Sequence, residues 1–252
     1  MSTAIWFVII TNMNKLYKQF AKYYDLIYTK KDYKSEFDYQ NKLIKKYQKS
    51  KGKDLLEVAC GTGRYLEYCE KTYHCTGFDL NQAMLNIAKK KLKKTKLHQG
   101  NMQTFDLHKQ FDIVTCLFSS IGYLKNTKQL EQTIVNFSKH LKPGGVFLIS
   151  PWLSKQAFKV GSIHMNGYYD DNIKITRAVV SKFKKPNISV MDFHWMIAER
   201  NKDVKYISGD KHELTMFTEK EFKTAFTKAG LKVDFIKQNK DSRGLYVAVK
   251  AL

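Results

Sequence analysis

The chain has 252 residues, 43% of them apolar, so it can bury a substantial core in one large domain or in one domain with an insertion. Its formal net charge of +21 comes mainly from lysines spread along the chain. This spread favours a solvated lysine surface over a nucleic-acid interface, and it is compatible with an anionic small substrate. The four cysteines show no metal-ligand spacing, which argues against a metal site and favours reduced, buried thiols in a cytoplasmic protein.

The N-terminal fifty residues predict an extension followed by helices. Residues 4–10 are apolar, but this run is far shorter than the roughly 20 residues needed to span a bilayer. We interpret residues 1–12 as an accessory strand, a disordered extension or an artefact, and the chain as soluble. Between 14 and 50, aromatic and aliphatic residues recur at helical spacing, which predicts two or three helices before the first strand.

A predicted buried strand at 55–59 runs directly into Gly61-Thr62-Gly63, and a helical stretch follows at 64–70. In open parallel sheets this order of strand, glycine turn and helix presents a ligand site at the carboxyl end of the strand. A second apolar run ends at Asp79, 18 residues after Gly61. An acidic residue at about this distance is well placed to bond the two hydroxyls of a ribose.

Two departures from the dinucleotide fingerprint narrow the choice of ligand. Leu66 stands where that fingerprint has its third glycine, and Glu57 lies inside the predicted strand. The Glu57 carboxylate would repel a pyrophosphate, but it can accept a hydrogen bond from an ammonium group. S-adenosylmethionine has an ammonium group and no phosphate, so these residues favour it over a dinucleotide.

Helices and strands continue to alternate after Asp79, which predicts right-handed crossovers and a parallel sheet. Asn81 is the predicted N-cap of the helix that follows. The predicted elements are a helix at 81–94, strands at 97–99 and 111–117, a loop at 118–124, a helix at 128–141, a turn at 143–145 and a strand at 146–149.

From Pro151 the pattern changes to strands at 173–183, 188–200 and 211–217, which predicts an antiparallel insertion or lid. Thr218 has capping-box spacing to Glu221, so a helix is predicted to begin there and to end near Gly230. A hairpin at 231–237 and 244–250 closes the chain. We therefore expect an extension and helical cap at 1–50, a cofactor-binding α/β core at 51–150, an antiparallel β lid at 151–217, and a C-terminal helix and hairpin at 218–252 that complete the core.

Five motifs, at 57–63, 78–80, 100–102, 111–114 and 141–145, resemble in order and spacing those of class I S-adenosylmethionine-dependent methyltransferases. The resemblance covers roughly residues 17–250. It implies a Rossmann-like sheet, parallel with an antiparallel C-terminal hairpin, and an N-terminal cap that closes over the cofactor. Residue pattern and resemblance together predict cofactor contacts by Tyr33, Glu57, Ala59, Gly61, Gly63, Asp79, Leu80, Met84, Asn101, Met102 and Leu117. At Asn101 many relatives have an acidic residue, but an asparagine can still accept from the adenine amino group.

Further stretches at 116–124, 150–152, 214–218, 225–231 and 242–245 resemble the N,N-dimethyltransferases that act on dTDP-linked amino sugars. The resemblance implies N-methylation of a sugar amine, with S-adenosylhomocysteine as the product of the cofactor. Arg243 suits a diphosphate and Trp152 a sugar or base face. Tyr123 is the first candidate to receive the amine proton, with His194 or His212 as alternatives. Tyr17 of the N-terminal cap is predicted to face the site and is the second catalytic candidate. The predicted substrate-binding residues are Ser119, Ser120, Trp152, His194 and Arg243.

One departure keeps other acceptors open. Ser150 stands where the amino-sugar enzymes have an acidic residue before the Pro-Trp pair. An amino acid or another small metabolite is therefore an alternative acceptor, and RNA is a less favoured one because no RNA-binding module is appended. A protein that binds the cofactor without catalysis is the remaining alternative. A homodimer is one assembly that the sequence allows, and no metal constellation is expected.

Overall fold

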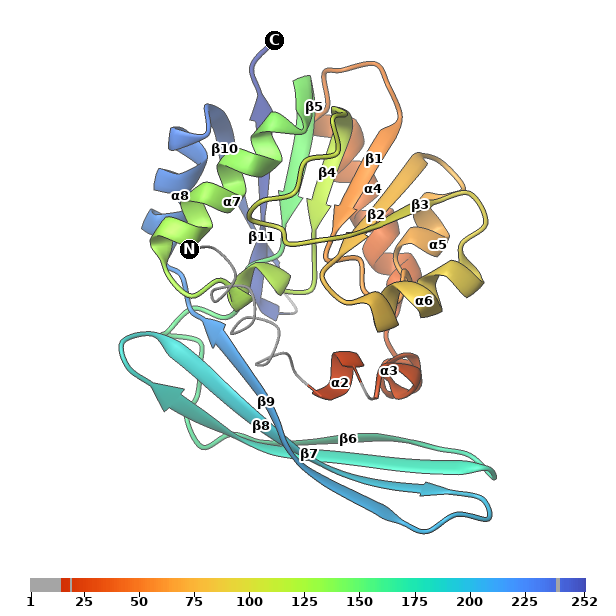
Figure 1. Ribbon diagram of the computed structural model, residues 1–252. Helices are drawn as coiled ribbons and strands as arrows, with labels where there is room; N and C mark the ends of the chain where they lie inside the picture. The colour runs from red at the N-terminus through yellow and green to blue at the C-terminus, as the bar shows by residue number, and fades with distance from the viewer. Residues whose placement is uncertain (1–14, 19, 239–240) are drawn as a thin grey trace, which may run out of the picture.

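The computed structural model describes residues 15–18, 20–238 and 241–252, so the predicted extension at 1–12 lies outside the described residues. Two β-sheets organise the molecule (Figure 1). The larger, or core sheet, has the strand order β10-β11-β5-β4-β1-β2-β3. Its strands are β1 (Asp54–Val58), β2 (His74–Asp79), β3 (Lys96–Gln99), β4 (Phe111–Cys116), β5 (Leu141–Ile149), β10 (Leu231–Gln238) and β11 (Asp241–Lys250).

The core sheet has the predicted mixture of strand directions. Strands β1 to β5 pair in parallel, while β11 runs antiparallel between β5 and β10. This confirms the expected parallel sheet with an antiparallel C-terminal hairpin. Because the first five strands are parallel, their carboxyl ends meet at one edge of the sheet, where ligands bind in open α/β folds.

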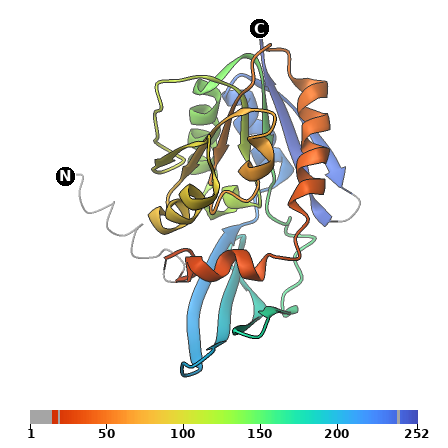
Figure 2. The same cartoon turned by 90° about the vertical axis from the view of Figure 1, so that its right-hand side faces the viewer.

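Helices cover both faces of the core sheet (Figures 1 and 2). Helices α4, α5 and α6 pack on one face, and α7 and α8 pack on the other. Each face buries its own apolar cluster, so nearly every central strand residue lies in a core. The helices are α2 (Lys15–Lys18), α3 (Ala21–Ile27), α4 (Tyr33–Tyr47), α5 (Leu66–Cys69), α6 (Gln82–Lys91), α7 (Thr127–Lys139) and α8 (Glu219–Lys228), with a 3-10 turn η1 (Ser120–Tyr123).

Local signals in the sequence explain where several helices begin and end. Asn81 caps α6 by accepting from the backbone N–H of Ala83 at 2.9 Å, and Thr218 forms the predicted capping box on α8. Helix α7 ends at Lys139, before the predicted limit of 141. Leu141 instead starts β5 and pairs with Phe111, so the predicted turn at 143–145 lies inside the strand, where the register shifts.

The second sheet, here called the lid sheet, contains β6 (Ile163–Tyr169), β7 (Ile173–Lys184), β8 (Ile188–Glu199) and β9 (Lys205–Thr215), all antiparallel. The sequence predicted three of these strands and missed β6. This edge strand is mostly exposed and carries Asn166 and Gly167, so it has little apolar alternation to reveal it. Strand β9 also begins at Lys205 and not at 211.

Helices α2 and α3 lie between the lid sheet and the carboxyl edge of the core sheet (Figures 1 and 2). Leu16, Tyr23 and Ile27 pack against Trp195 and Ile197 on the inner face of the lid sheet. Two or three helices were expected before the first strand, and the described residues contain three there, α2, α3 and α4. Among the described residues, no helix is long and apolar enough to cross a membrane.

Candidate active site

The glycine turn after β1 contains several residues with positive φ angles. Ala59, Gly61 and Gly63 have φ angles of +60°, +56° and +75°. A Cβ added at Gly63 would lie 2.7 Å from a methyl group of Leu92, so this turn packs too tightly against α6 for a side chain. The turn therefore brings bare backbone to the carboxyl edge of the core sheet.

Asp79 holds this turn from the end of β2. Its Oδ2 accepts from the Gly61 N–H at 2.8 Å and its Oδ1 accepts from the Asn81 N–H at 2.8 Å. Burial raises the pKa of Asp79 above its usual value, although the same backbone hydrogen bonds act to lower it. The side chain of Met84 is buried beside the turn, and Leu80 is exposed at the edge. The two backbone hydrogen bonds to Asp79 fix the orientation of its carboxylate, and its bonding of the two ribose hydroxyls stays a prediction.

Glu57 is a buried carboxyl group with one oxygen that a cationic donor could satisfy. It is 2% exposed, and its Oε2 has no hydrogen-bond partner among the described residues. Burial raises its pKa well above the usual range, and the nearby Cys75 and Asp79 raise it further. An ammonium group would satisfy the orphaned oxygen and favour the ionised form. The residues present therefore fit the amino-acid end of S-adenosylmethionine.

The predicted adenine side is formed at the end of β3. The Asn101 Oδ1 accepts from the Gln103 N–H at 2.9 Å, which turns the chain and leaves one lone pair of that oxygen. Met102 packs against the apolar cluster on the α7 face, and its carbonyl accepts from Asn136. Leu117 is buried at the end of β4. Contacts of Asn101, Met102 and Leu117 with the cofactor stay predictions.

The N-terminal cap is tied to the glycine turn by one aspartate. Asp25 in α3 accepts from the Thr62 hydroxyl at 2.6 Å and pairs with Lys91 of α6 at 2.7 Å. Tyr33 is buried at the start of α4, with the Arg64 guanidinium 5.4 Å from its ring centroid. The cap thus contacts the glycine turn, and its closure over the cofactor stays a prediction.

The loop after β4 begins with a strained backbone. Phe118 and Ser119 have successive φ angles of +54° and +64°, which side chains other than glycine rarely adopt. The Ser119 hydroxyl donates to the Pro151 carbonyl at 2.7 Å, which joins this loop to the end of β5. Ser120 starts the 3-10 turn that carries Tyr123. Strain at this point directs η1 across the carboxyl edge, toward the lid sheet.

The structure brings together Tyr17 and Tyr123, the two residues predicted separately as catalytic candidates. Their hydroxyl oxygens are 2.9 Å apart, and the Tyr123 hydroxyl lies 2.7 Å from Nδ1 of His212. Behind the histidine, its Nε2 lies 3.3 Å from Oδ1 of Asp210. Sequence reasoning missed Asp210. The alternation of 210, 212 and 214 along one face of a strand was the signal that could have found it.

His194 lies elsewhere. Its ring is exposed, with Nδ1 2.5 Å from the Tyr206 hydroxyl oxygen. The next residue of the strand, Trp195, is buried on the inner face of the lid sheet. Successive strand residues point to opposite faces, so His194 is on the outer face of the lid sheet. The structure brings His212 to the site and leaves His194 away from it.

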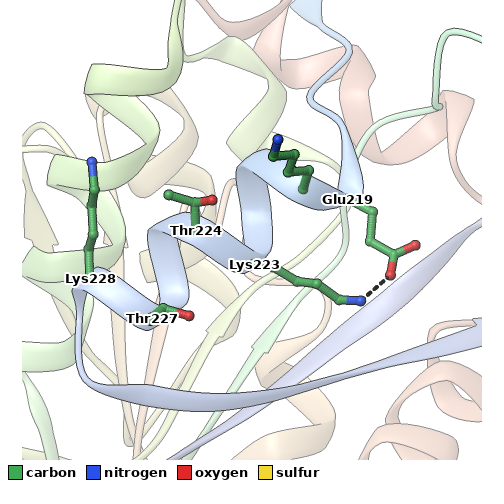
Figure 3. Close-up of a pocket in the computed structure, with 6 residues that line it drawn as sticks. Glu219, Lys223, Thr224, Thr227 and Lys228 are labelled. Carbon is green, nitrogen blue, oxygen red and sulfur yellow. Dashed lines mark ion pairs between the residues drawn. The ribbon is translucent and has the colours of Figure 1, made fainter.

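Trp152, in the loop after β5, and Arg243, in β11, lie close together. The Arg243 guanidinium lies 5.9 Å from the Trp152 ring centroid, and the Trp152 Nε1–H donates to the Ser189 hydroxyl at 2.7 Å. The indole is thereby held between the core sheet and the lid sheet. A separate hollow on the outer surface of α8, with the ion pair Lys223–Glu219 at 2.7 Å, contains none of the predicted site residues (Figure 3).

Comparison with known proteins agrees with this geometry. Residues 55–145 match the family model described as a methyltransferase domain. The chain is 37% identical over 234 residues to the dTDP-3-amino-3,4,6-trideoxy-alpha-D-glucopyranose N,N-dimethyltransferase of Streptomyces venezuelae, covering 92% of this chain and 98% of that protein. It is 30% identical to the dTDP-3-amino-3,6-dideoxy-alpha-D-glucopyranose N,N-dimethyltransferase of Streptomyces fradiae, covering 92% and 91%.

A solved structure gives the same result. The crystal structure of Streptomyces venezuelae DesVI matches with a TM-score of 0.85 and 36% identity, covering 92% of this chain and 98% of that one. The likeness extends over the core sheet, the cap and the lid sheet. The chain therefore belongs to the class I S-adenosylmethionine-dependent methyltransferases, in the family of the dTDP-amino-sugar N,N-dimethyltransferases.

Proposed function

We propose that this enzyme transfers methyl groups from S-adenosylmethionine to the amino group of a nucleotide-linked sugar of the dTDP type. The observation that carries the proposal is the extent of the likeness. The methyltransferase domain model ends at residue 145, whereas the likeness to an amino-sugar enzyme covers 98% of that enzyme. It therefore extends beyond residue 145 into the lid sheet and the C-terminal hairpin, and so into the part of the chain that holds the predicted acceptor residues Trp152 and Arg243.

In this proposal the cofactor lies along the carboxyl edge of the core sheet. The Glu57 carboxylate receives the ammonium group, the glycine turn receives the amino-acid part, and Asp79 bonds the ribose hydroxyls. The buried, unpaired oxygen of Glu57 and the fixed orientation of Asp79 support this placement. When bound, the cofactor supplies an electrophilic methyl group. The chain then has to align an amine with that methyl and exclude water.

The acceptor lies between the strained loop after β4 and the lid sheet, which we propose acts as its lid over residues 151–217. Arg243 binds the diphosphate with charge-assisted hydrogen bonds, and the Trp152 face packs against the sugar or the base. Their convergence at 5.9 Å supports this pairing. Ser120 bonds a sugar hydroxyl, and Ser119 adds an acceptor lone pair while its proton is held by Pro151.

The test is release of S-adenosylhomocysteine with a panel of acceptors: dTDP-amino sugars, the same amino sugars without the nucleotide, free amino acids and bulk tRNA. Turnover on the dTDP-amino sugars supports the proposal. Arg243→Ala should raise KM for the dTDP-amino sugar roughly 10- to 100-fold, the worth of a hydrogen bond to a charged group. It should leave the affinity for the cofactor unchanged.

The matched control is Arg200→Ala. Arg200 follows β8 and donates to the Asp171 carbonyl at an exposed end of the lid sheet, so its loss should leave KM unchanged. Turnover on amino acids alone would replace the sugar by another small acceptor. Cofactor binding without turnover on any acceptor would leave only a binding protein.

We propose further that two copies pair through the outer face of the lid sheet. Residues that pair across antiparallel strands share a face, and this face carries an exposed apolar patch over all four strands. Its members are Ile163, Met165, Val180, Met196 and Tyr206. Sedimentation should show a dimer that Met196→Lys dissociates, and a wild-type monomer would refute the pairing.

The four buried, unpaired cysteines fit a cytoplasmic location.

A further inference from the structure

Two buried ionisable residues on the inner face of the lid sheet have no part in binding the cofactor or the acceptor. Asp210 is 0% exposed and His212 is 4% exposed, and both belong to β9. They lie directly behind Tyr123, whose hydroxyl contacts Nδ1 of His212. A buried carboxylate and imidazole are costly to keep in a protein unless they are paired. Their pairing with the tyrosine needs an explanation beyond packing.

Asp210 is surrounded by hydrogen-bond donors. Its Oδ1 accepts from the backbone N–H of Leu16 at 3.1 Å, and its Oδ2 accepts from the Trp195 Nε1–H at 2.9 Å. The third neighbour is Nε2 of His212, 3.3 Å from Oδ1. Burial acts to raise the pKa of Asp210, but the histidine and the other two donors outweigh it and hold the pKa below its usual value. The carboxylate is therefore ionised.

The ionised carboxylate determines which tautomer of His212 suits the site. Because Asp210 offers only acceptor oxygens, a neutral His212 with Nε2 at 3.3 Å from Oδ1 carries its proton on Nε2, which leaves Nδ1 as an acceptor. The Tyr123 hydroxyl then donates to Nδ1 at 2.7 Å, and the Tyr17 hydroxyl donates to the Tyr123 oxygen at 2.9 Å. At the far end the Tyr17 oxygen keeps its lone pairs. The hydrogen bonds thus donate in one direction, from the half-buried phenol of Tyr17 through Tyr123 to the buried imidazole of His212.

We propose that Tyr17, Tyr123 and His212 form a proton relay for the acceptor nitrogen, with Asp210 as the residue that positions His212. This inference rests on the proposed N-methylation. An ammonium acceptor gives a proton to the Tyr17 oxygen, the Tyr17 proton moves to Tyr123, and the Tyr123 proton moves to Nδ1. The nitrogen lone pair, now free, forms the N–C bond as the S–C bond of the sulfonium breaks. His212 ends as an imidazolium paired with the Asp210 carboxylate, so the charges balance.

The phenols conduct the proton and do not store it. Burial, first of all, raises the pKa of both Tyr17 and Tyr123 well above the ordinary tyrosine value, so neither is a phenolate at neutral pH. A neutral phenol is a poor proton acceptor, whereas Nδ1 of the neutral imidazole has a lone pair that can take up the proton at the end of the relay. The ionisable groups around the relay are Tyr24 of α3, Tyr28 directly after α3, Asp79 at the end of β2, Asp210 of β9, and Arg177 of β7, which stacks on the Phe193 ring that contacts His212.

Aromatic side chains enclose His212, and this limits the route by which its extra proton can leave. The ring centroids of Tyr17 and Phe193 lie 5.6 and 5.3 Å from that of the imidazole, and Tyr123 covers Nδ1. The stored proton therefore leaves by the route on which it came, through the two phenols, once the product has gone.

The direct test is the tautomer of His212 in the full chain without any ligand. Two-bond nitrogen–proton correlation spectra of the ¹⁵N-labelled protein report which ring nitrogen carries the proton, and comparison with His212→Asn assigns the signal among the seven histidines. We expect the Nε2–H form with Nδ1 as acceptor. A proton on Nδ1 would overturn the relay, because the histidine would then donate to Tyr123. This test does not depend on the acceptor, so it separates failure of the relay from failure of the proposed function.

The kinetic test compares His212→Asn, which keeps an acceptor for the Tyr123 hydroxyl but takes up no proton, with the matched control His194→Asn on the outer face of the same sheet. His212→Asn should lower kcat at pH 7 roughly 100-fold, the lower end of general-base contributions, and should leave KM for cofactor and acceptor within about threefold. The kcat of the wild type should level off at high pH. The kcat of His212→Asn should continue to rise there, because the proton of the acceptor amine must then pass to solvent.

Two further variants guard against a folding artefact. Tyr123→Phe breaks the relay in the loop after β4, outside the lid sheet, and should give the same change in the pH profile of kcat. Asp210→Asn removes the charge that positions the imidazole and should give a smaller loss. A wild-type kcat and pH profile in His212→Asn, or identical losses in His194→Asn, would refute the relay.

Discussion

Replacing Glu57 by Gln should weaken cofactor binding and stabilise the free protein at the same time. In the structure Oε2 has no partner among the described residues, and the side chain is 2% exposed. A hydrogen bond between charged groups is worth about 1.5–3 kcal/mol. Its loss corresponds to a Kd for S-adenosylmethionine that is raised roughly 10- to 150-fold. Titration calorimetry measures this change.

The stability of the free protein should change in the opposite direction, and only above a certain pH. Burial raises the pKa of Glu57 in the folded state, so the folded protein binds a proton that the unfolded chain has already lost. Wild-type stability therefore falls as pH rises from about 4.3, the ordinary glutamate pKa, toward the raised value. Glutamine does not titrate, so the stability of the variant lacks this pH dependence. We expect the variant to be more stable by about 1–2 kcal/mol at pH 8, and indistinguishable from wild type below pH 4.

For a chain of this length that gain corresponds to a Tm higher by roughly 2–8 °C at pH 8. The control is Glu219→Gln, an exposed carboxylate on α8 that should change neither Kd nor the pH dependence of Tm. Equal melting of Glu57→Gln and wild type from pH 5 to 8 would refute the argument that burial raises the pKa of Glu57 at a cost in stability. A Kd raised less than threefold would refute its pairing with the ammonium group.

Three further predictions follow from contacts away from Glu57. Thr62→Val removes the 2.6 Å hydrogen bond to Asp25 and should speed release of the cofactor several-fold in stopped-flow measurements; an unchanged rate would mean that the cap is held by other contacts. Asp112→Asn removes the charge of a buried carboxylate that pairs with the half-buried Lys142 at 2.8 Å, and it should cost about 1–3 kcal/mol at pH 7 in urea unfolding. Burial opposes the lysine pair and the backbone donors, yet the pKa of Asp112 is lowered, so this difference should shrink as pH falls through the acid range and should persist at pH 8. Thr218→Ala should lower stability by about 1 kcal/mol and Thr218→Ser should not, as judged by denaturant midpoints.

The core sheet could be predicted because its signals are local. Buried strands of a parallel sheet read as apolar runs, and the glycine turn, Asn81 and Thr218 each fix their own backbone through neighbours in sequence. The end of α7 could not be placed in this way. Leu141 is apolar at helical spacing, but pairing with Phe111 across the sheet draws it into β5.

The lid side of the site was harder, because its geometry depends on distant pairing. Asp210 and His212 gain a role only when β9 is placed behind the loop that carries Tyr123, 89 residues earlier in the chain. His194 and His212 look alike as single residues. Counting alternate positions from the buried Trp195 would have placed His194 on the outer face, and this step needs only the period of a strand.

The Leu16 N–H bonds a carboxylate 194 residues further along the chain, which has a consequence for how the protein is made. During synthesis the segment containing α2 and α3 leaves the ribosome first, yet its packing partners in β8 and β9 appear only when four fifths of the chain has been translated. Such distant contacts close late, because the entropy of a long loop must be overcome first. The earliest residues to be made are thus among the last to settle, and a nascent chain should gain its cofactor cap only after termination.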